Sequence, residues 1–310
     1  MVTIIGLLTF QKEKCDFVVL ECGLGGRLDA TNVVGYPDVL CSAVTSVGMD
    51  HMDVLGNSLE SISKEKSFVI KKDVPCVLGP SCAMTSAFKA RVAETGSPAT
   101  WIENQGSFEC ENNLIVESII GIVCASQKLP VPVGLSQKIA SWRQPCRFEQ
   151  IPDSKVVLDV CHNIDGFKAV LKQIPASYPE VTEISVVFGI SKGKRLDQIV
   201  ELLENSPLVK DLHIVSRPHM RLYKCEDAHK LVASLGSTKL RDLRIDQEDN
   251  DTHSDSASSE IRQENNIAKT LDYVLGRQNE KSLVVVCGSF FIMSDVKTYF
   301  GQHMEVDNIM

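Results

Sequence analysis

The 310-residue sequence contains no apolar run approaching the roughly 20 residues that a membrane-spanning helix needs, and its first ten residues lack the basic region of a secretory signal. Its eleven cysteines include no Cys-x-x-Cys pair and are scattered and odd in number. These absences predict a cytoplasmic protein that does not bind membranes, with the mitochondrion as an open alternative. They also favour reduced, buried cysteines over a disulfide scaffold or a metal site.

An excess of positive charge is missing as well. The formal net charge is −8, which argues against nucleic acid as the main partner. Six of the acids, and no Lys or Arg, fall within residues 246–260, so the rest of the chain carries only −2. This acidic segment cannot bury apolar area, and we expect a disordered surface insertion there. A phosphorylated regulatory loop is the sharper interpretation of its serines.

Internal repeats are also absent, and the length predicts two domains. Short β-branched runs alternate with amphipathic segments, which predicts an α/β fold with a parallel sheet. The prolines between Leu129 and Gly134 indicate a domain boundary, giving domains 1–134 and 135–310. The expected strands are 17–20, 39–45, 75–78, 156–159, 184–188, 212–215 and 283–287. The expected helices are 59–70, 85–94, 112–127, 135–142, 166–174, 196–205, 226–235 and 291–300, with Ser58 and Gly96 as caps.

The densest motif is Glu-Cys-Gly-Leu-Gly-Gly-Arg-Leu-Asp-Ala-Thr-Asn at residues 21–32, directly after the first expected strand. Glycine-rich turns at the carboxyl end of a parallel strand bind ligands in many α/β proteins. A dinucleotide fingerprint would need glycine at Leu28, however, and no Gly-Lys-Ser or Gly-Lys-Thr occurs anywhere in the sequence. A purely structural turn is as good an interpretation of these glycines as a binding loop.

A second cluster, Thr-Ser-Val-Gly-Met-Asp-His at residues 45–51, also leaves a strand end, and Lys66 follows on the next expected helix. Glu21, Asp50 and His51 therefore form a candidate site for a divalent cation. Taken singly, His51 is more typical of a hydrogen-bonded structural histidine than of a metal ligand, and Lys66 is typical of a solvated helix face.

A third cluster opens the second domain: Pro-Cys-Arg-Phe-Glu at residues 145–149, followed by Leu-Asp-Val-Cys-His-Asn at 158–163. Asp159 and His162 could bind ribose hydroxyls or position a phosphate, and Arg147 could neutralise phosphate charge. The plainer alternative for Asp159 is an N-cap of the following helix.

Together these motifs resemble the signature of the folylpolyglutamate synthase and dihydrofolate synthase family, a branch of the Mur ligases. The matching segments occur in family order at residues 20–32, 45–56, 64–66, 147–149, 158–163 and 288–290. The resemblance implies a Mur-ligase-type, P-loop-like central domain, truncated at its N-terminus, and a Rossmann-like C-terminal domain.

The resemblance also implies an ATP-dependent ligase that joins L-glutamate to folate or dihydropteroate through an acyl phosphate, with Mg²⁺ neutralising phosphoryl charge. Glu21, His51 and a carbamylated Lys66 would then be metal ligands. Asn112 would contact adenine, and Arg147, Asp159 and His162 would reach ATP from the second domain as the domains close. The motif loop would consist of Gly23, Gly25, Gly26, Asp29 and Asn32. We expect a monomer.

The sequence departs from the family pattern in lacking the Gly-Lys-Ser phosphate loop that relatives carry before the glycine motif. That loop holds the β- and γ-phosphates, so its absence predicts impaired activity. The alternatives are therefore an incomplete gene model of a working ligase, and a paralogue that binds nucleotide or folate without turnover. A Rossmann-type dehydrogenase is the remaining alternative, against which the missing glycine at Leu28 counts. Glu109, where relatives commonly have Gln, makes adenine recognition by this segment less secure.

Overall fold

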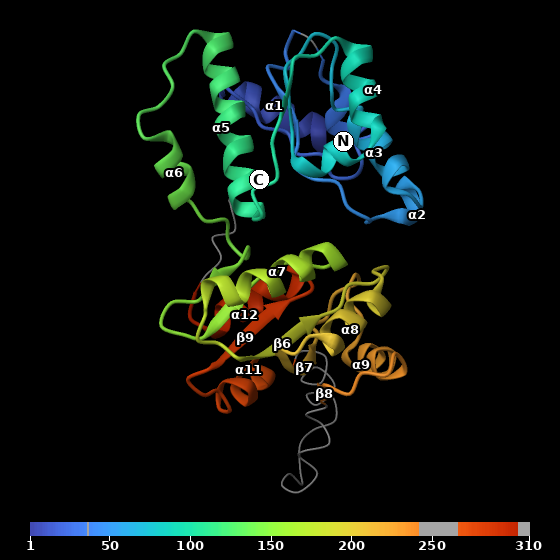
Figure 1. Cartoon of the computed structure of the whole chain (residues 1–310), viewed down its shortest axis with the longest axis vertical. Coiled ribbons are helices and arrows are strands. Elements are labelled where there is room, and N and C mark those ends of the chain that lie inside the picture. Colours follow the sequence, from blue (N-terminus) through green and yellow to red (C-terminus); the bar gives the residue numbers. More distant parts are fainter. Residues whose placement is uncertain (36, 242–265, 303–310) are drawn as a thin grey trace, which may run out of the picture. The chain divides into compact units, whose positions relative to one another are not determined.

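The computed structural model describes residues 1–35, 37–241 and 266–302 and divides the chain into two compact units, Met1–Trp142 and Arg143–Met310 (Figure 1). The expected acidic insertion 246–260 lies outside the described residues. Along the sequence, the first unit ends eight residues after the boundary predicted from the prolines. The reason is that helix α6 (Leu135–Ser141) contacts α5 (Phe108–Gln127) and so belongs to the first unit.

The first unit contains a three-stranded parallel sheet in the order β1 (Ser42–Val44), β2 (Cys76–Leu78), β3 (Ala99–Trp101). Ile62 and Phe88 are fully buried in a core that includes Cys76 and Leu78 of β2. The helical elements of this unit besides α5 and α6 are α1 (Val2–Lys12), η1 (Ala30–Val33), α2 (Met52–Leu55), α3 (Leu59–Ser67), η2 (Pro80–Met84) and α4 (Ser86–Thr95). The sheet and its helices confirm the predicted α/β class for this unit.

Two helix ends of this unit match the sequence-based prediction. Ser58 and Ser61 form a reciprocal capping box at the start of α3, which satisfies two orphan backbone donors. Gly96 ends α4 in the left-handed conformation, with φ of 66°. Both ends could be predicted because capping depends on local side chains alone.

The predicted strand Phe17–Leu20 is wrong. These residues are not in a strand, and Val19 is 93% exposed. None of their backbone groups bonds to another described residue. A strand covered on both faces needs a neighbouring strand for its amides, and no described strand lies there to supply one. The preceding helix α1 buries none of its residues, although it is strongly apolar.

The second unit contains a six-stranded sheet in the order β4-β5-β9-β6-β7-β8, parallel except for the pair β4–β5. The bounds are β4 Glu149–Gln150, β5 Val156–Leu158, β6 Glu183–Gly189, β7 Val209–Val215, β8 Leu240–Arg241 and β9 Ser282–Cys287. The helical elements are α7 (Ile164–Ser177), α8 (Leu196–Asn205), α9 (Cys225–Ser234), α11 (Ile267–Leu275), η4 (Phe290–Ile292) and α12 (Met293–Tyr299).

Both faces of this sheet are covered, as the continuously apolar strands predict. Val186 and Phe188 of β6 pack with residues of α7, α8 and α9, whereas Val187 between them packs with residues of α11 and α12. Side chains two apart on a strand share a face, so this split follows the strand period. The parallel α/β architecture predicted for this part of the chain is confirmed.

All eleven cysteines are free, and seven of them are buried, in agreement with the prediction of reduced, core-forming thiols. Burial raises the pKa of Cys76 to about 11, as expected for a thiol kept away from water. Among the described helices, none is both long enough and apolar enough to cross a membrane.

Glu204, on α8, joins the end of that helix to the segment before β8. Its carboxylate accepts hydrogen bonds from the Ser237 and Thr238 hydroxyls and from the Lys239 amide. Burial alone would raise the pKa of Glu204, but these hydrogen bonds lower it to about 2. Because the folded-state pKa is depressed, the carboxylate contributes its full stabilisation above pH 4.5 and loses it as the pH falls to about 2.

We therefore expect Glu204→Gln to lower the urea midpoint at pH 7, with the gap to the unchanged protein narrowing as the pH approaches 2. Urea titrations followed by circular dichroism at a series of pH values measure this gap. Glu201→Gln, an exposed neighbour on the same helix, is the matched control and should shift little. A gap that stays constant with pH would contradict the assignment.

Candidate functional site

The glycine motif folds into a loop that is closed by its own aspartate. The Asp29 carboxylate accepts hydrogen bonds from the amides of Gly23 (2.8 Å), Leu24 (3.0 Å) and Thr31 (2.8 Å). Burial tends to raise the pKa of Asp29, but these bonds and one from the Thr31 hydroxyl lower it overall. Two amides of the glycine-rich turn are thus already occupied by a carboxylate.

The same loop packs directly against the last turn of α3, the helix that carries Lys66. A Cβ at Gly26 would lie 2.8 Å from the carbonyl oxygen of Glu65 and 2.9 Å from that of Lys66, so only glycine permits this approach. The Arg27 amide donates to the Glu65 carbonyl at 3.0 Å, and the two side chains form an ion pair. Gly25, in the preceding position, adopts a φ of 67°. These glycines therefore serve a close contact between loop and helix.

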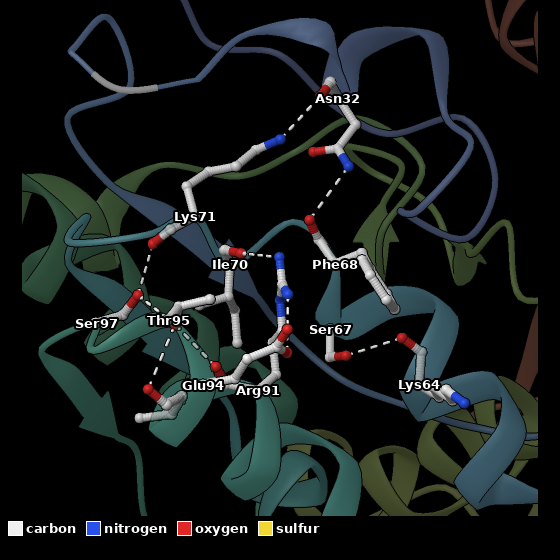
Figure 2. A network of polar contacts seen from close by, with 11 residues as sticks. Asn32, Lys64, Ser67, Phe68, Ile70, Lys71, Arg91, Glu94, Thr95 and Ser97 are labelled. Carbon is white, nitrogen blue, oxygen red and sulfur yellow. Dashed lines mark hydrogen bonds and ion pairs between the residues drawn. The ribbon is translucent and has the colours of Figure 1, made fainter.

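Asn32, the last residue of the motif, extends this contact beyond the helix end (Figure 2). Its side-chain amide donates to the Phe68 carbonyl at 3.2 Å, and the Lys71 ammonium donates to the Asn32 carbonyl at 2.8 Å. Lys71 in turn accepts a hydrogen bond from the Ser97 hydroxyl at its carbonyl, and Arg91 lies over the Phe68 ring at 4.6 Å. The chain on both sides of Lys66 is thus fixed by polar contacts.

The segment after β1 is anchored on the segment after β2, because the Val47 amide donates to the Ser81 hydroxyl at 2.7 Å. His51 lies at the start of α2 with a left-handed φ of 52°. Its amide donates to the Asp50 carboxylate at 2.8 Å, and the His51 Nε2 atom lies 3.9 Å from that carboxylate. His51 is exposed, so this strained backbone presents its imidazole to solvent.

Lys66 is half-buried, and its side chain makes no hydrogen bond or ion pair to a described residue. Its charge acts on Cys82, which follows β2: burial raises the pKa of that thiol to about 12 although Lys66 opposes the shift. Lys66 therefore lies near the carboxyl-terminal edge of the sheet. Residues 45–51 leave the same edge, so the structure places two of the predicted segments at one end of the sheet.

Glu21 is exposed and has no hydrogen-bonding partner in the described part of the chain. Within that part, no three His, Cys, Asp or Glu side chains are grouped closely enough to hold a metal ion. Mg²⁺ bound with a nucleotide needs only one or two protein carboxylates, because phosphates and water supply the other ligands. The Glu21 carboxylate fits that mode of binding, whereas a cage built entirely from protein ligands does not fit.

In the second unit, the structure brings Arg147, Asp159 and His162 together around the end of β5. The Asp159 carboxylate accepts hydrogen bonds from the amides of Phe148 (2.9 Å) and Cys161 (2.7 Å). Burial raises its pKa, against the effect of these bonds. The His162 Nδ1 atom lies 3.0 Å from the Val160 carbonyl, which can only accept, so Nδ1 carries the proton.

The alternative interpretation of Asp159 as a helix N-cap is wrong, because Asn163 caps α7. The Asn163 side chain accepts a hydrogen bond from the Gly166 amide at 2.9 Å.

We expect Asn163→Ala to lower the free energy of unfolding by about 1 kcal/mol, measured by urea titration. Asn163→Ser keeps a capping oxygen and should lose much less. Equal stability of the alanine variant and the unchanged protein would contradict this role.

Asn112, the predicted adenine contact, is exposed near the start of α5, and its side chain has no hydrogen bond to a described residue. The contact between Asn112 and adenine therefore stays a prediction.

The second unit contains a basic cavity that was not predicted from the sequence. Its volume is about 290 Å³, and it lies beyond the carboxyl ends of β6 and β7. His219 stacks on Phe291 at 3.9 Å, and Arg217 donates to Asp295 at 3.0 Å. The lining residues include no acid: Lys192, Ser216, Arg217, Pro218, His219, Met220, Leu222, Tyr223 and Lys224. The basic residues clustered within 217–224 were the sequence signal from which this cavity could have been predicted.

A larger, open hollow of about 880 Å³ lies at the opposite edge, beside the amino ends of β5 and β9. Ligands of open α/β sheets bind at the carboxyl ends of strands, so the smaller cavity is the better candidate.

No family model matches this chain. Among curated proteins, the chain is 22% identical to the dihydrofolate synthetase of Saccharomyces cerevisiae over 95% of its own length and 74% of that protein. It is 25% identical to the dihydrofolate synthase/folylpolyglutamate synthase of Haemophilus influenzae over 76% of its length and 61% of that protein. It is 27% identical to the folylpolyglutamate synthase of Lacticaseibacillus casei, of which it spans 52%. The chain thus spans between half and three-quarters of the length of these relatives.

Solved structures show the same fold. E. coli FolC in complex with DHPP and ADP superposes with a TM-score of 0.72 at 23% identity, over 95% of this chain and 69% of that one. Mycobacterium tuberculosis folylpolyglutamate synthase complexed with ADP and AMPPCP gives 0.73 at 18% identity, over 98% and 73%. The order of motifs, the α/β fold and these similarities agree. This chain is a distant homologue of the folylpolyglutamate synthase/dihydrofolate synthase family over most of its length.

Proposed function

We propose that this chain is an ATP-dependent ligase that joins the amino group of L-glutamate to a carboxylate of folate or dihydropteroate through an acyl phosphate. The observation that carries the proposal is the contact between the glycine motif and the turn that holds Lys66. Gly26 touches the Lys66 carbonyl, and Asn32 fixes the chain just beyond it. The names of the curated relatives supply the reaction class.

The Lys66 side chain would coordinate a cation only after carbamylation, because an ammonium group has no lone pair to donate. In that step its neutral amine adds to the carbon of CO₂ and releases a proton, leaving an anionic oxygen donor of the kind that Mg²⁺ prefers. Glu21 and His51 would be the other protein ligands. The bound ion would neutralise negative charge on the phosphates.

Arg147 would bind a phosphate of ATP, because its exposed guanidinium makes no hydrogen bond or ion pair to a described residue and can accept an anion. Asp159 and His162 would bind the ribose or orient the phosphate, and Asn112 would contact adenine. The roles of the carbamylated Lys66 and of these four residues rest on the resemblance. Arg147 and Asn112 are exposed, His162 is half-buried and Asp159 is buried.

The basic cavity of the second unit would take the carboxylates of L-glutamate. Lys192, Arg217 and His219 line it, and its volume of about 290 Å³ suits a small ligand. Two carboxylates need several cationic or hydrogen-bonding donors, and this cavity concentrates them at the strand ends where such sheets bind ligands.

Release of ADP from ATP by the purified chain tests the proposed reaction. We expect release that requires both L-glutamate and a pterin carboxylate, with either omission returning the rate to the background. Equal release without the pterin substrate would show a simple ATPase and would contradict the proposal.

The second candidate function is binding of nucleotide or folate without turnover. One observation favours it: the amides of Gly23 and Leu24 are occupied by Asp29. An ATP analogue that binds in a calorimetric titration, without ADP release under any substrate combination, would establish this alternative.

A further inference from the structure

The turn that carries Arg147 has a strained backbone. Cys146 and Phe148, on either side of the arginine, have φ values of 57° and 46°. Neither is glycine, and such residues stay in the left-handed region only where their surroundings hold them there. The conformation of this turn therefore depends on specific contacts.

Two carboxylates supply these contacts. The Cys146 amide donates to Glu149 Oε2 at 2.6 Å, and the Phe148 amide donates to Asp159 Oδ2 at 2.9 Å. The Cys146 carbonyl accepts from the Val160 amide at 2.9 Å. Each left-handed residue thus has its amide bonded to an acidic side chain, and the arginine is held between them.

A buried lysine from a distant part of the chain holds one of these carboxylates. Lys297, on α12, is 7% exposed, and its Nζ atom lies 2.8 Å from Glu149 Oε1. Lysine is almost never this buried without a partner, because the ammonium gives up its hydration. Glu149 therefore uses one oxygen for the turn and the other for Lys297.

We propose that Lys297 and Glu149 are positioning residues that hold the Arg147 guanidinium where it binds a phosphate of ATP. The inference rests on the proposed function, since Arg147 is assigned there to the phosphate. Lys297 acts only through Glu149 and the turn, and its effect on nucleotide affinity therefore requires Arg147.

A double-mutant cycle on the full chain tests this dependence. The probe is the nonhydrolysable ATP analogue AMPPCP with Mg²⁺, and the readout is its Kd from isothermal titration calorimetry. We expect Arg147→Ala to weaken binding about tenfold and Lys297→Met to weaken it by roughly three- to tenfold. In the Arg147→Ala background, Lys297→Met should cause no further loss.

The controls separate positioning from general damage. Lys168→Met, at an exposed lysine on α7, should leave Kd unchanged, and Lys297→Arg should restore most of the affinity. In the ligand-free protein, amide hydrogen exchange at residues 146–148 should be faster in Lys297→Met. If that variant does not fold, Glu149→Gln takes its place in the same cycle.

The outcomes are distinct. Equal losses from Lys297→Met with and without Arg147, or an unchanged Kd in Arg147→Ala, would overturn the positioning role while leaving nucleotide binding intact. No binding of the analogue by the unchanged protein would overturn both the proposed function and this inference.

Discussion

Replacing Gly79 by alanine is expected to destabilise the first unit strongly and to displace the segment that carries His51. A Cβ at Gly79 would lie far inside van der Waals contact with the carbonyl oxygen of Thr45. The obstructing atom belongs to the backbone and cannot rotate away. We expect a loss of about 3 kcal/mol or more in the free energy of unfolding, the upper end for overpacked sites.

Tryptophan fluorescence during urea titration measures this loss, because Trp101 and Trp142, the only tryptophans of the chain, both belong to the first unit. Gly121→Ala is the matched control, since a Cβ there meets nothing within 4 Å. Gly121 lies within α5, so the control should stabilise the unit by up to about 1 kcal/mol. Equal midpoints for Gly79→Ala and the unchanged protein would contradict the described path of residues 45–51.

Lys66→Ala is expected to reduce glutamate-dependent ADP release by roughly 100-fold or more, comparable to losing a main electrostatic contact in an active site. The reason is the proposed carbamate, which alanine cannot form. The urea midpoint should change little, because the Lys66 side chain makes no hydrogen bond or ion pair to a described residue. Initial rates at saturating ATP measure the effect, and added acetate or formate should restore part of the activity.

Lys64→Ala is the control for this experiment. Lys64 is exposed on the same helix, two residues before Lys66, so its removal changes the net charge equally. We expect a rate close to that of the unchanged protein. Comparable rates for the two variants would show that Lys66 has no special role.

Local signals in the sequence predicted much of the fold. Helix α8 occupies the predicted bounds Leu196–Asn205, because its apolar positions recur with helical spacing and four of its residues are buried. β6, β7 and β9 were recognisable as apolar runs. The pattern could not reveal β3, Ala99–Trp101, whose three residues include an exposed threonine and gain their strand character from pairing with β2.

The incorrect strand prediction at Phe17–Leu20 has the opposite cause to the missed strand β3. Its residues have high strand propensity, but a strand also needs paired backbone groups, and propensity contains no information about a neighbour. α1 and α11 were not predicted, although both are apolar helices.

The motifs of the candidate site could be read from sequence, whereas the contacts that hold them could not. Gly26 was recognised as a motif residue, but its packing on α3 depends on Glu65 and Lys66, 39 and 40 positions away. Lys297 lies 148 residues from Glu149, and no local pattern connects them. Long-range contacts of this kind require the folded chain.

We propose that this chain forms an amide bond between L-glutamate and a pterin carboxylate. Mass spectrometry of the pterin product after incubation with ATP, Mg²⁺ and isotopically labelled L-glutamate tests it most directly. We predict a product heavier by one labelled glutamyl residue, formed with one ADP per bond and absent when ATP is omitted. An unmodified pterin, recovered from protein that binds the ATP analogue with Mg²⁺, would contradict the claim.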